Sequence, residues 1–296
     1  MSTQPDSFLR GIFPALVTPL KPDGSVHVRS LEQLVERMYN AGANGLYLCG
    51  STGEGLRMQP DARQLVAEVV KSLSPKEKQT LVHVGAGSLE ETLDLARRAS
   101  RLGVTAISSL PLARMAATEL PGFYRAIAVT STLPVVAYYF PAHTGYSLTF
   151  EQLAQLGRTP GVEGVKFTDY DLYALSRLND AGLRVLNGRD EILVAGLIMG
   201  AVGGIGSLYN VIPGRVVELF RMTSEGRWEE ARRLQVRVTR FITMMLSFPL
   251  LPAIKQVLAW SGIHCGHTLG NSSVLTAEQQ QRLRAELDRY QDLLTA

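Results

Sequence analysis

Apolar and polar positions follow two alternating patterns along this chain. Short runs rich in Val, Ile, Leu and aromatic residues recur at intervals, as is typical of buried strands. The runs are Ile12–Leu20, Gly45–Gly50, Leu81–Gly87, Ala106–Pro111, Pro134–Phe140, Val162–Thr168, Arg184–Gly188 and Gly203–Tyr209. They predict eight strands.

The stretches between these runs have the spacing of amphipathic helices. In Ser30–Ala41, for example, Leu31, Leu34 and Met38 fall on one helical face. Further stretches with this spacing are Gln64–Leu73 and Leu89–Leu102. Strands that alternate with helices pair in parallel through right-handed crossovers, so the pattern predicts an α/β fold, a (β/α)8 TIM barrel.

The pattern changes after the eighth strand and helix. Only helical periodicity remains, in Trp228–Leu246, Leu251–Ser261 and Thr276–Leu294, the last with Thr276 as its N-cap. No Pro/Gly/Ser-rich linker precedes these segments. We therefore expect a barrel over residues 1–226 and, packed on it, a C-terminal extension of about three helices over residues 227–296.

Composition narrows the possible classes of protein. The chain has 296 residues, 46% hydrophobic and 19% charged, so it can bury a large core, which excludes a disordered chain, a coiled coil or a disulfide-rich miniprotein. The formal net charge is +3, and its basic residues form no dense cluster, so we expect neither a nucleic-acid nor a membrane partner.

The cysteines and the N-terminal sequence point to a reducing compartment. Cys49 and Cys265 are too few for a disulfide framework and too dispersed for a zinc site, so no metal is expected. The first ten residues, MSTQPDSFLR, lack the apolar region of a signal peptide, and no apolar run reaches the roughly 18 residues that a membrane span requires. We expect a cytoplasmic protein.

Lys166 is the first candidate catalytic residue. It lies inside an apolar strand, where its neighbours Val165 and Phe167 should point outward to the helices and leave the amine inside the barrel. Burial disfavours the charged form of an amine and so favours a nucleophile that forms Schiff bases with carbonyl substrates. The alternative is a structural ion pair with Asp190 or Glu191.

Tyr138 and Tyr139 end the preceding strand. Alternation sends their side chains to opposite faces, so one enters the barrel mouth while the other packs against helices. A phenol beside an imine-forming lysine can move protons to and from the substrate oxygen. Both tyrosines are also compatible with a core role.

Three glycine-containing segments, one after the second predicted strand, one at the end of the seventh and one along the eighth, are candidates for substrate binding. The loop GSTGEG, Gly50–Gly55, suits a carboxylate because glycines allow inward-pointing N–H groups, although an ordinary tight turn fits as well. The segment GRDE contains Asp190 and Glu191, which suit a polyhydroxylated ligand, although Asp190 could instead cap a helix. The segment GGIGS, Gly203–Ser207, lacks the glycine spacing of a dinucleotide-binding loop.

Together these motifs resemble the dihydrodipicolinate synthase / N-acetylneuraminate lyase family of pyruvate-dependent class I aldolases. The resemblance rests on GSTGE after the second strand, Tyr138-x-x-Pro141, the strand-six Lys166 and a glycine-rich eighth strand, in the family's order from Ile12 to about Tyr209. It implies a Schiff-base aldolase without a cofactor, and a homotetramer.

The resemblance also assigns roles to residues. It implies that Lys166 forms a Schiff base with pyruvate and that Tyr138 relays protons. It implies further that Ser51 and Thr52 hold the pyruvate carboxylate, with Ile205 closing over the imine. Within the family the pattern is closest to the N-acetylneuraminate lyases, in which the positions that hold the sugar's polyol correspond here to Thr168, Gly188, Asp190, Glu191 and Ser207.

Two departures from the family pattern bear on the substrate. His143 stands where dihydrodipicolinate synthases usually carry a carboxylate-binding arginine, which disfavours that reaction. The segment Leu110–Thr118 lacks the family's tyrosine that reaches into the neighbouring subunit, and Arg114 could instead contact an acidic substrate. The alternatives are an aldolase or dehydratase for another 2-oxo acid, such as 2-keto-3-deoxygluconate, a dihydrodipicolinate synthase, and a non-catalytic protein that binds pyruvate or a sugar acid.

Overall fold

The predicted strands form one parallel sheet in the computed structural model, which describes residues 7–145, 147–270 and 274–294. The strands are β1 (Gly11–Pro14), β2 (Gly45–Leu48), β3 (Gln79–His83), β4 (Ala106–Ser109), β5 (Val135–Tyr139), β6 (Val162–Phe167), β7 (Arg184–Asn187) and β8 (Gly203–Gly206). Their order in the sheet is β1-β8-β7-β6-β5-β4-β3-β2, so neighbours in sequence are neighbours in space.

Hydrogen bonds between β1, β2 and the residues next to them close the sheet into a barrel. The Leu16 amide donates to the Tyr47 carbonyl at 2.9 Å, and the Asn44 amide donates to the Ile12 carbonyl at 2.9 Å. A parallel bridge also joins Ala15 to Tyr47. The predicted fold class, a (β/α)8 barrel, is therefore confirmed.

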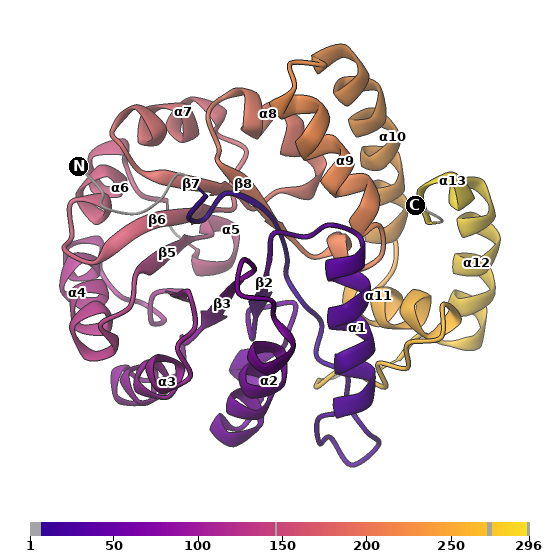
Figure 1. The fold of residues 1–296 in the computed structure, drawn as a ribbon, viewed down its shortest axis with the longest axis horizontal. Helices are drawn as coiled ribbons and strands as arrows, with labels where there is room; N and C mark the ends of the chain where they lie inside the picture. Colours follow the sequence, from indigo (N-terminus) through magenta and orange to yellow (C-terminus); the bar gives the residue numbers. More distant parts are fainter. Residues whose placement is uncertain (1–6, 146, 271–273, 295–296) are drawn as a thin grey trace.

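Helices surround the barrel, and all of them except the last, which follows β8, lie in the connections between one strand and the next (Figure 1). They are α1 (Val28–Asn40), α2 (Pro60–Leu73), α3 (Leu89–Arg101), α4 (Leu120–Ser131), α6 (Phe150–Gly157), α7 (Leu172–Asp180), α8 (Leu193–Ile198) and α9 (Pro213–Ser224), with the one-turn α5 (Pro141–Thr144) after β5. In α1 the predicted apolar face is buried, and the His27 side chain caps the helix by accepting from the Ser30 amide at 3.1 Å.

Two apolar layers hold the barrel together. A small cluster fills its interior and includes Phe13, Tyr47, Val136, Leu186 and Ile205. A larger cluster lies between the outer faces of the strands and the surrounding helices. This division follows from the alternation of side chains along each strand.

The C-terminal helices α10 (Trp228–Leu246), α11 (Leu250–Trp260), α12 (Ala277–Leu287) and α13 (Gln291–Leu294) lie together at one side of the barrel (Figure 1). Thr276 caps α12 as predicted, because its side chain accepts from the Gln279 amide. The amide of Leu20 donates to the carbonyl of Cys265 at 3.0 Å, which ties this part of the chain to the segment after β1. The division at residues 226 and 227 stays a prediction, and residues 1–6 and 295–296 lie outside the described residues.

The first and last strands are shorter than predicted. The apolar segment Ala15–Leu20 is buried but not a strand, because the Asn210 side chain provides hydrogen bonds that a neighbouring strand would otherwise make. Its amide group donates to the Ala15 carbonyl at 2.7 Å and its oxygen accepts from the Val17 amide at 3.2 Å. After Gly206 the chain turns into the 3-10 helix Leu208–Asn210 rather than continuing β8.

Among the described helices, none is by itself long and apolar enough to cross a membrane. Only α10 and α11 taken together pass that test by length and composition, and they meet at a bend of 109°.

Candidate active site

Lys166 lies inside the barrel near the end of β6. It pairs in register with Tyr138 on β5 and Leu186 on β7. Its neighbours Val165 and Phe167 belong to the outer apolar cluster, as predicted, and only 5% of Lys166 is exposed. The predicted orientation of Lys166 is confirmed.

Two aromatic rings flank the Lys166 amine. Its Nζ lies 4.1 Å from the centre of the Tyr138 ring and 4.3 Å from that of Tyr47. None of the ion pairs within 7–145, 147–270 and 274–294 includes Lys166, so the structural pair with Asp190 or Glu191 is not formed. Because no carboxylate holds the Lys166 amine among the described residues, the amine is free to react with a carbonyl carbon, as a Schiff-base lysine requires.

The two tyrosines of β5 separate as expected. Tyr139 belongs to the outer cluster and stacks on Phe167 at 5.2 Å between ring centres, whereas Tyr138 faces the mouth beside Lys166. The Tyr138 ring stacks on Phe140 at 6.0 Å, and Phe140 stacks on His143 of α5 at 5.6 Å. This aromatic stack fixes the orientation of the Tyr138 phenol.

His83 and Tyr47 complete the aromatic cluster, and the sequence analysis did not assign either to the site. Both rings meet the Tyr138 ring edge to face, at 6.2 and 6.4 Å. The His83 Nε2 accepts from the Leu110 amide at 3.1 Å, and its Nδ1 has no partner among the described residues. Burial, together with the charges of Arg63 and Lys166, places the pKa of His83 well below its usual value, so this histidine is neutral at pH 7.

The loop after β2 folds back tightly on itself. A Cβ on Gly55 would lie 1.8 Å from the Cys49 carbonyl oxygen, so only glycine fits there. Ser51 at the tip is exposed, and the Thr52 hydroxyl lies 2.6 Å from that of Ser207 after β8. The structure thus brings two of the predicted binding residues, Thr52 and Ser207, into contact across the closure of the barrel.

Asp190 lies beside this junction in a poorly hydrated position. Its Oδ2 accepts from the Leu208 amide at 2.9 Å, at the start of the 3-10 helix Leu208–Asn210, whereas among the described residues no side chain caps the 3-10 helix Asp190–Ile192. Loss of hydration, aided by the charge of Glu191, raises the Asp190 pKa to about 7, while the Leu208 amide and the Lys166 charge oppose this rise. Asp190 therefore exchanges a proton near neutral pH.

Thr168 and Gly188 lie against each other beyond the ends of β6 and β7. A Cβ on Gly188 would lie 2.1 Å from the Thr168 hydroxyl, so glycine is required at this position. Thr168 is only 5% exposed, and its hydroxyl has no hydrogen-bond partner within the described parts of the chain. A buried hydroxyl without a partner is costly, so a bound polar molecule would stabilise it.

Tyr170 and Arg189 extend the site outward, and sequence reasoning missed both. The Tyr170 hydroxyl donates to the Glu191 carboxylate, which raises the pKa of Tyr170. The Arg189 guanidinium lies 4.4 Å from the centre of the Tyr170 ring and 5.5 Å from that of Phe140.

In the described segments, no three His, Cys, Asp or Glu side chains gather as metal ligands.

Helix α10 supports the backbone that carries the acidic pair. The Gln235 side chain donates to the Asp190 carbonyl at 3.2 Å and accepts from the Val194 amide at 3.1 Å. The Thr239 hydroxyl donates to the Glu191 carbonyl at 3.0 Å. The C-terminal helices therefore contribute to the shape of the barrel mouth.

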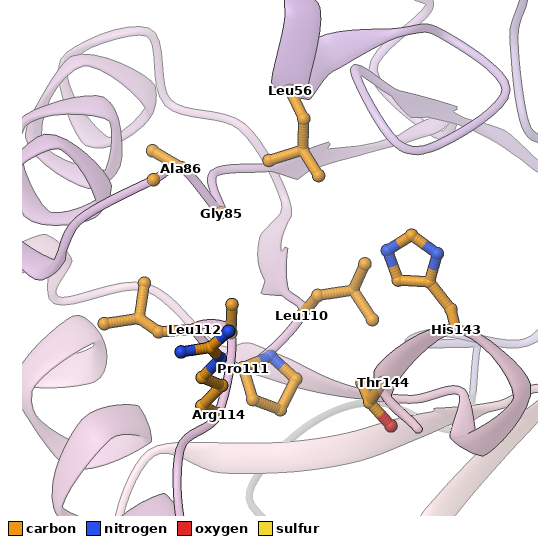
Figure 2. A pocket seen from close by; sticks show the side chains of 11 residues that line it. Leu56, Gly85, Ala86, Leu110, Pro111, Leu112, Arg114, His143 and Thr144 are labelled. Atoms are coloured by element: carbon orange, nitrogen blue, oxygen red, sulfur yellow. The ribbon is translucent and has the colours of Figure 1, made fainter. Parts of the chain in front are cut away.

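A cavity of about 410 Å³ lies at another part of the mouth. Its lining comes from the segments after β2, β3, β4 and β5, and Lys166 is not part of it. Figure 2 shows Leu56 and His143 pointing toward the space from different segments, with Arg114 beside Leu112. Arg114 is exposed and has a positive φ of 64°, which turns the chain sharply at this point.

The sequence matches one family over nearly its whole length. Residues 8–289 match the model of the Dihydrodipicolinate synthetase family. The chain belongs to this family. The membership predicted from the motifs is therefore confirmed.

Individual relatives agree with this result. A curated N-acetylneuraminate lyase of Rhizobium meliloti (strain 1021) is 34% identical over 262 residues, 87% of each chain. The crystal structure of N-acetylneuraminate lyase from Fusobacterium nucleatum complexed with pyruvate has a TM-score of 0.91 at 25% identity, covering 96% of this chain and 98% of that one. A Clostridium difficile protein solved in complex with mannosamine has a TM-score of 0.91 at 27% identity, and the match covers 95% of this chain and 99% of that one. Family and relatives confirm the predicted enzyme class, a Schiff-base aldolase that is a carbon–carbon lyase.

Proposed function

We propose that this enzyme reversibly cleaves a 2-oxo sugar acid, N-acetylneuraminate, to pyruvate and N-acetylmannosamine through a Schiff base on Lys166. The observation that carries the proposal is the setting of Lys166, a buried amine 4.1 Å from the Tyr138 ring centre that forms no ion pair within the described residues. The names of the curated relatives support the substrate.

The reaction begins with attack of the neutral Lys166 amine on the 2-oxo carbon of the open-chain substrate. Loss of water gives a protonated imine, which withdraws electrons from the neighbouring carbon. Tyr138 gives its phenol proton to the hydroxyl that leaves as water, and the resulting phenolate then takes the proton of the C4 hydroxyl, directly or through the substrate carboxylate, while the C3–C4 bond breaks. The aldehyde leaves, the resulting enamine takes up a proton at C3, and water releases pyruvate and regenerates the amine.

No cofactor or metal is needed in this scheme, because the imine itself accepts the electron pair. Ser51 and Thr52 bind the carboxylate of pyruvate, and Ile205 closes over the imine from the barrel interior. The contact between Thr52 and Ser207, 2.6 Å between hydroxyl oxygens, supports a continuous site that runs from the carboxylate subsite toward the sugar subsite.

The polyol part of the substrate binds next to this contact, beyond the ends of β6, β7 and β8. Thr168, Gly188, Asp190, Glu191 and Ser207 form this subsite. Among the described residues the Thr168 hydroxyl has no partner, and the Asp190 carboxyl is poorly hydrated; both support the assignment, because vicinal hydroxyls offer donors and acceptors. The Glu191 carboxylate, already held by Tyr170, is oriented for a further hydrogen bond.

The separate cavity favours a second candidate reaction. Arg114 lines it, and a guanidinium suits an aldehyde or 2-oxo acid that carries a second negative charge. An aldolase or dehydratase for such a substrate would use the same Lys166 imine.

A homotetramer and a cytoplasmic location stay predictions. Light scattering on the purified protein tests the homotetramer.

Pyruvate release distinguishes these reactions. The purified enzyme is given N-acetylneuraminate, 2-keto-3-deoxygluconate, or pyruvate with aspartate semialdehyde, and pyruvate formation or consumption is followed with lactate dehydrogenase and NADH. We expect release from N-acetylneuraminate, with kcat/KM at least about tenfold above that for 2-keto-3-deoxygluconate, a difference of about 1.4 kcal/mol in transition-state binding. The reverse order would replace the proposed substrate. No turnover of any of them would indicate a binding protein.

A further inference from the structure

A buried ion pair joins the loop after β2 to the C-terminal helices. The Lys255 Nζ of α11 lies 2.8 Å from Glu54 Oε1, and the two side chains are only 2% and 0% exposed. The residues are 201 positions apart in sequence. Among the described residues, the further polar partners of this pair are the His267 carbonyl and the Leu269 amide, and they do not include Lys166, so we assign the pair no step of the reaction described above.

Both members of the pair have their remaining hydrogen bonds satisfied by the C-terminal segment. The Lys255 Nζ also donates to the His267 carbonyl at 2.6 Å, and the second Glu54 oxygen accepts from the Leu269 amide. A buried pair is tolerated only when its groups are bonded in this way. Glu54 therefore anchors its loop both to α11 and to the segment that follows it.

The backbone of this loop needs such an anchor. Cys49 and Glu54 both have left-handed conformations, with φ of 56° and 58°, which are unfavourable for residues other than glycine. The Gly55 amide donates back to the Gly50 carbonyl at 3.2 Å, and the Thr18 hydroxyl donates to the Gly53 carbonyl at 2.7 Å. Strained conformations of this kind persist where surrounding contacts enforce them.

The anchored turn carries the groups proposed to bind pyruvate. Thr52 is two residues before Glu54, and its hydroxyl contacts Ser207 across the barrel closure at 2.6 Å. Ser51 is exposed at the tip of the same turn. A displacement of Glu54 would therefore move both hydroxyls relative to the Lys166 amine.

We propose that Glu54 and Lys255 are positioning residues that set the carboxylate-binding turn, which makes the C-terminal helices part of the pyruvate site. This inference rests on the proposed function, because it takes Ser51 and Thr52 as the carboxylate ligands. Its consequence is selective: loss of the pair weakens binding of pyruvate while the reactivity of bound pyruvate with Lys166 is retained.

The test measures imine formation against pyruvate concentration, by borohydride trapping and intact mass, in the full-length enzyme. The double variant Glu54→Gln/Lys255→Met removes both charges at similar volume, and the introduced glutamine side chain still offers an oxygen to the Leu269 amide. We expect the half-saturating pyruvate concentration to rise at least about tenfold, with the maximal trapping rate within about threefold of wild type.

A matched control separates positioning from general loss of stability. Leu178 is fully buried in α7, which packs on α6, α8 and β7, so Leu178→Ala should lower the melting temperature and leave half-saturation unchanged. Should the double variant fail to fold, Glu54→Asp keeps the charge but shortens the anchor, and should raise half-saturation severalfold.

The outcomes distinguish the two proposals. Half-saturation within about twofold of wild type in a folded double variant, or in Glu54→Asp, would overturn the positioning role. An equal rise in Leu178→Ala would also overturn it, because the effect would then follow from stability alone. Failure of the wild-type enzyme to trap pyruvate would instead overturn the proposed function.

Discussion

Lys166 and Asp190 lie at the same mouth of the barrel but in different settings. Lys166 lies near the end of β6, paired in register with the strands on both sides, and the Tyr138 and Tyr47 rings flank its amine. Asp190 begins a short 3-10 helix, and Tyr170 and Glu191 near it belong to connecting segments. The reacting group is thus held by strands, whereas the groups proposed to select the substrate are held by loops.

The difference has a physical basis. A strand in a barrel has both neighbours hydrogen-bonded to it, so its side chains keep their positions without further support. A loop needs contacts from elsewhere, and here the C-terminal helices supply them through Gln235, Thr239 and Lys255. We therefore expect substitutions on the strands to affect kcat, and substitutions on the loops to affect KM and pH dependence.

Removal of the strand-held amine should have the largest effect. Lys166→Ala eliminates the nucleophile, and we expect kcat to fall by about 10⁴-fold or more. The fall in kcat is measured as the rate of pyruvate release from N-acetylneuraminate. The exposed Lys76 provides the control, because Lys76→Ala should keep wild-type kinetics. Substantial turnover by Lys166→Ala would contradict the assignment of the strand-held site.

Removal of one phenolic oxygen on β5 should come next. Tyr138→Phe keeps the ring beside Lys166 but removes the proton carrier, so we expect kcat to fall by about 10³-fold with little change in KM. Tyr139→Phe is the matched control on the outer face, where the hydroxyl accepts from the Leu148 amide at 3.4 Å, away from the Lys166 amine. Equal losses in the two variants would show that Tyr138 has no special role.

On the loop side, Asp190 should make stability depend on pH. Its pKa is about 7 in the folded chain against 3.8 for an ordinary aspartate, so between these two values the folded protein keeps a proton that the unfolded chain has lost. Unfolding then releases a proton, and stability falls as the pH rises through this range, by at most about 4 kcal/mol.

The variant Asp190→Asn removes this dependence. We expect the variant to be about 2 kcal/mol more stable than wild type at about pH 8. This gain is smaller than the full pH-dependent loss of about 4 kcal/mol in wild type, because the asparagine amide needs hydrogen-bond partners of its own. At about pH 4 we expect the variant to be no more stable than wild type. The free energies of unfolding of the variant and of wild type are measured by urea unfolding at both pH values. A stability advantage that is the same at the two pH values would show that Asp190 ionises normally.

The smallest effect is expected at Thr168. Thr168→Val keeps the shape of the side chain but removes a hydroxyl without a partner in the described structure. We expect the KM for N-acetylneuraminate to rise about tenfold, corresponding to one hydrogen bond of about 1.4 kcal/mol. Pyruvate trapping should be unchanged, because pyruvate lacks the polyol. A change in both would place Thr168 at the imine instead.

The sequence alone predicted the fold well because the apolar pattern is regular. Alternation placed Lys166 inside the barrel and separated Tyr138 from Tyr139, and the structure confirms both. The end of β1 was predicted too far along the chain, because Ala15–Leu20 is as apolar as a strand but is bonded by Asn210. A run of apolar residues indicates that a segment is buried. It does not indicate whether a neighbouring strand or a side chain such as Asn210 makes the hydrogen bonds of that segment, because this depends on the tertiary structure.

Contacts across the barrel were beyond sequence reasoning. In the sequence, Tyr47 looks like one more apolar residue of the second strand, and none of its sequence neighbours indicates its contact with Lys166 on β6. Alternation around Leu46 and Leu48 does place it inward, which was the available signal. The Glu54–Lys255 pair spans 201 positions, and only the folded chain brings it together.

Borohydride trapping tests the central claim most directly. The enzyme is reduced in the presence of pyruvate in one sample and of N-acetylneuraminate in another, and the products are read by intact mass and peptide mapping. We predict the same reduced pyruvate adduct on Lys166 in both samples, because cleavage of the sugar acid leaves the pyruvate imine on the enzyme. An adduct from pyruvate alone would contradict the proposed substrate, and no adduct in either sample would contradict the Schiff-base mechanism itself.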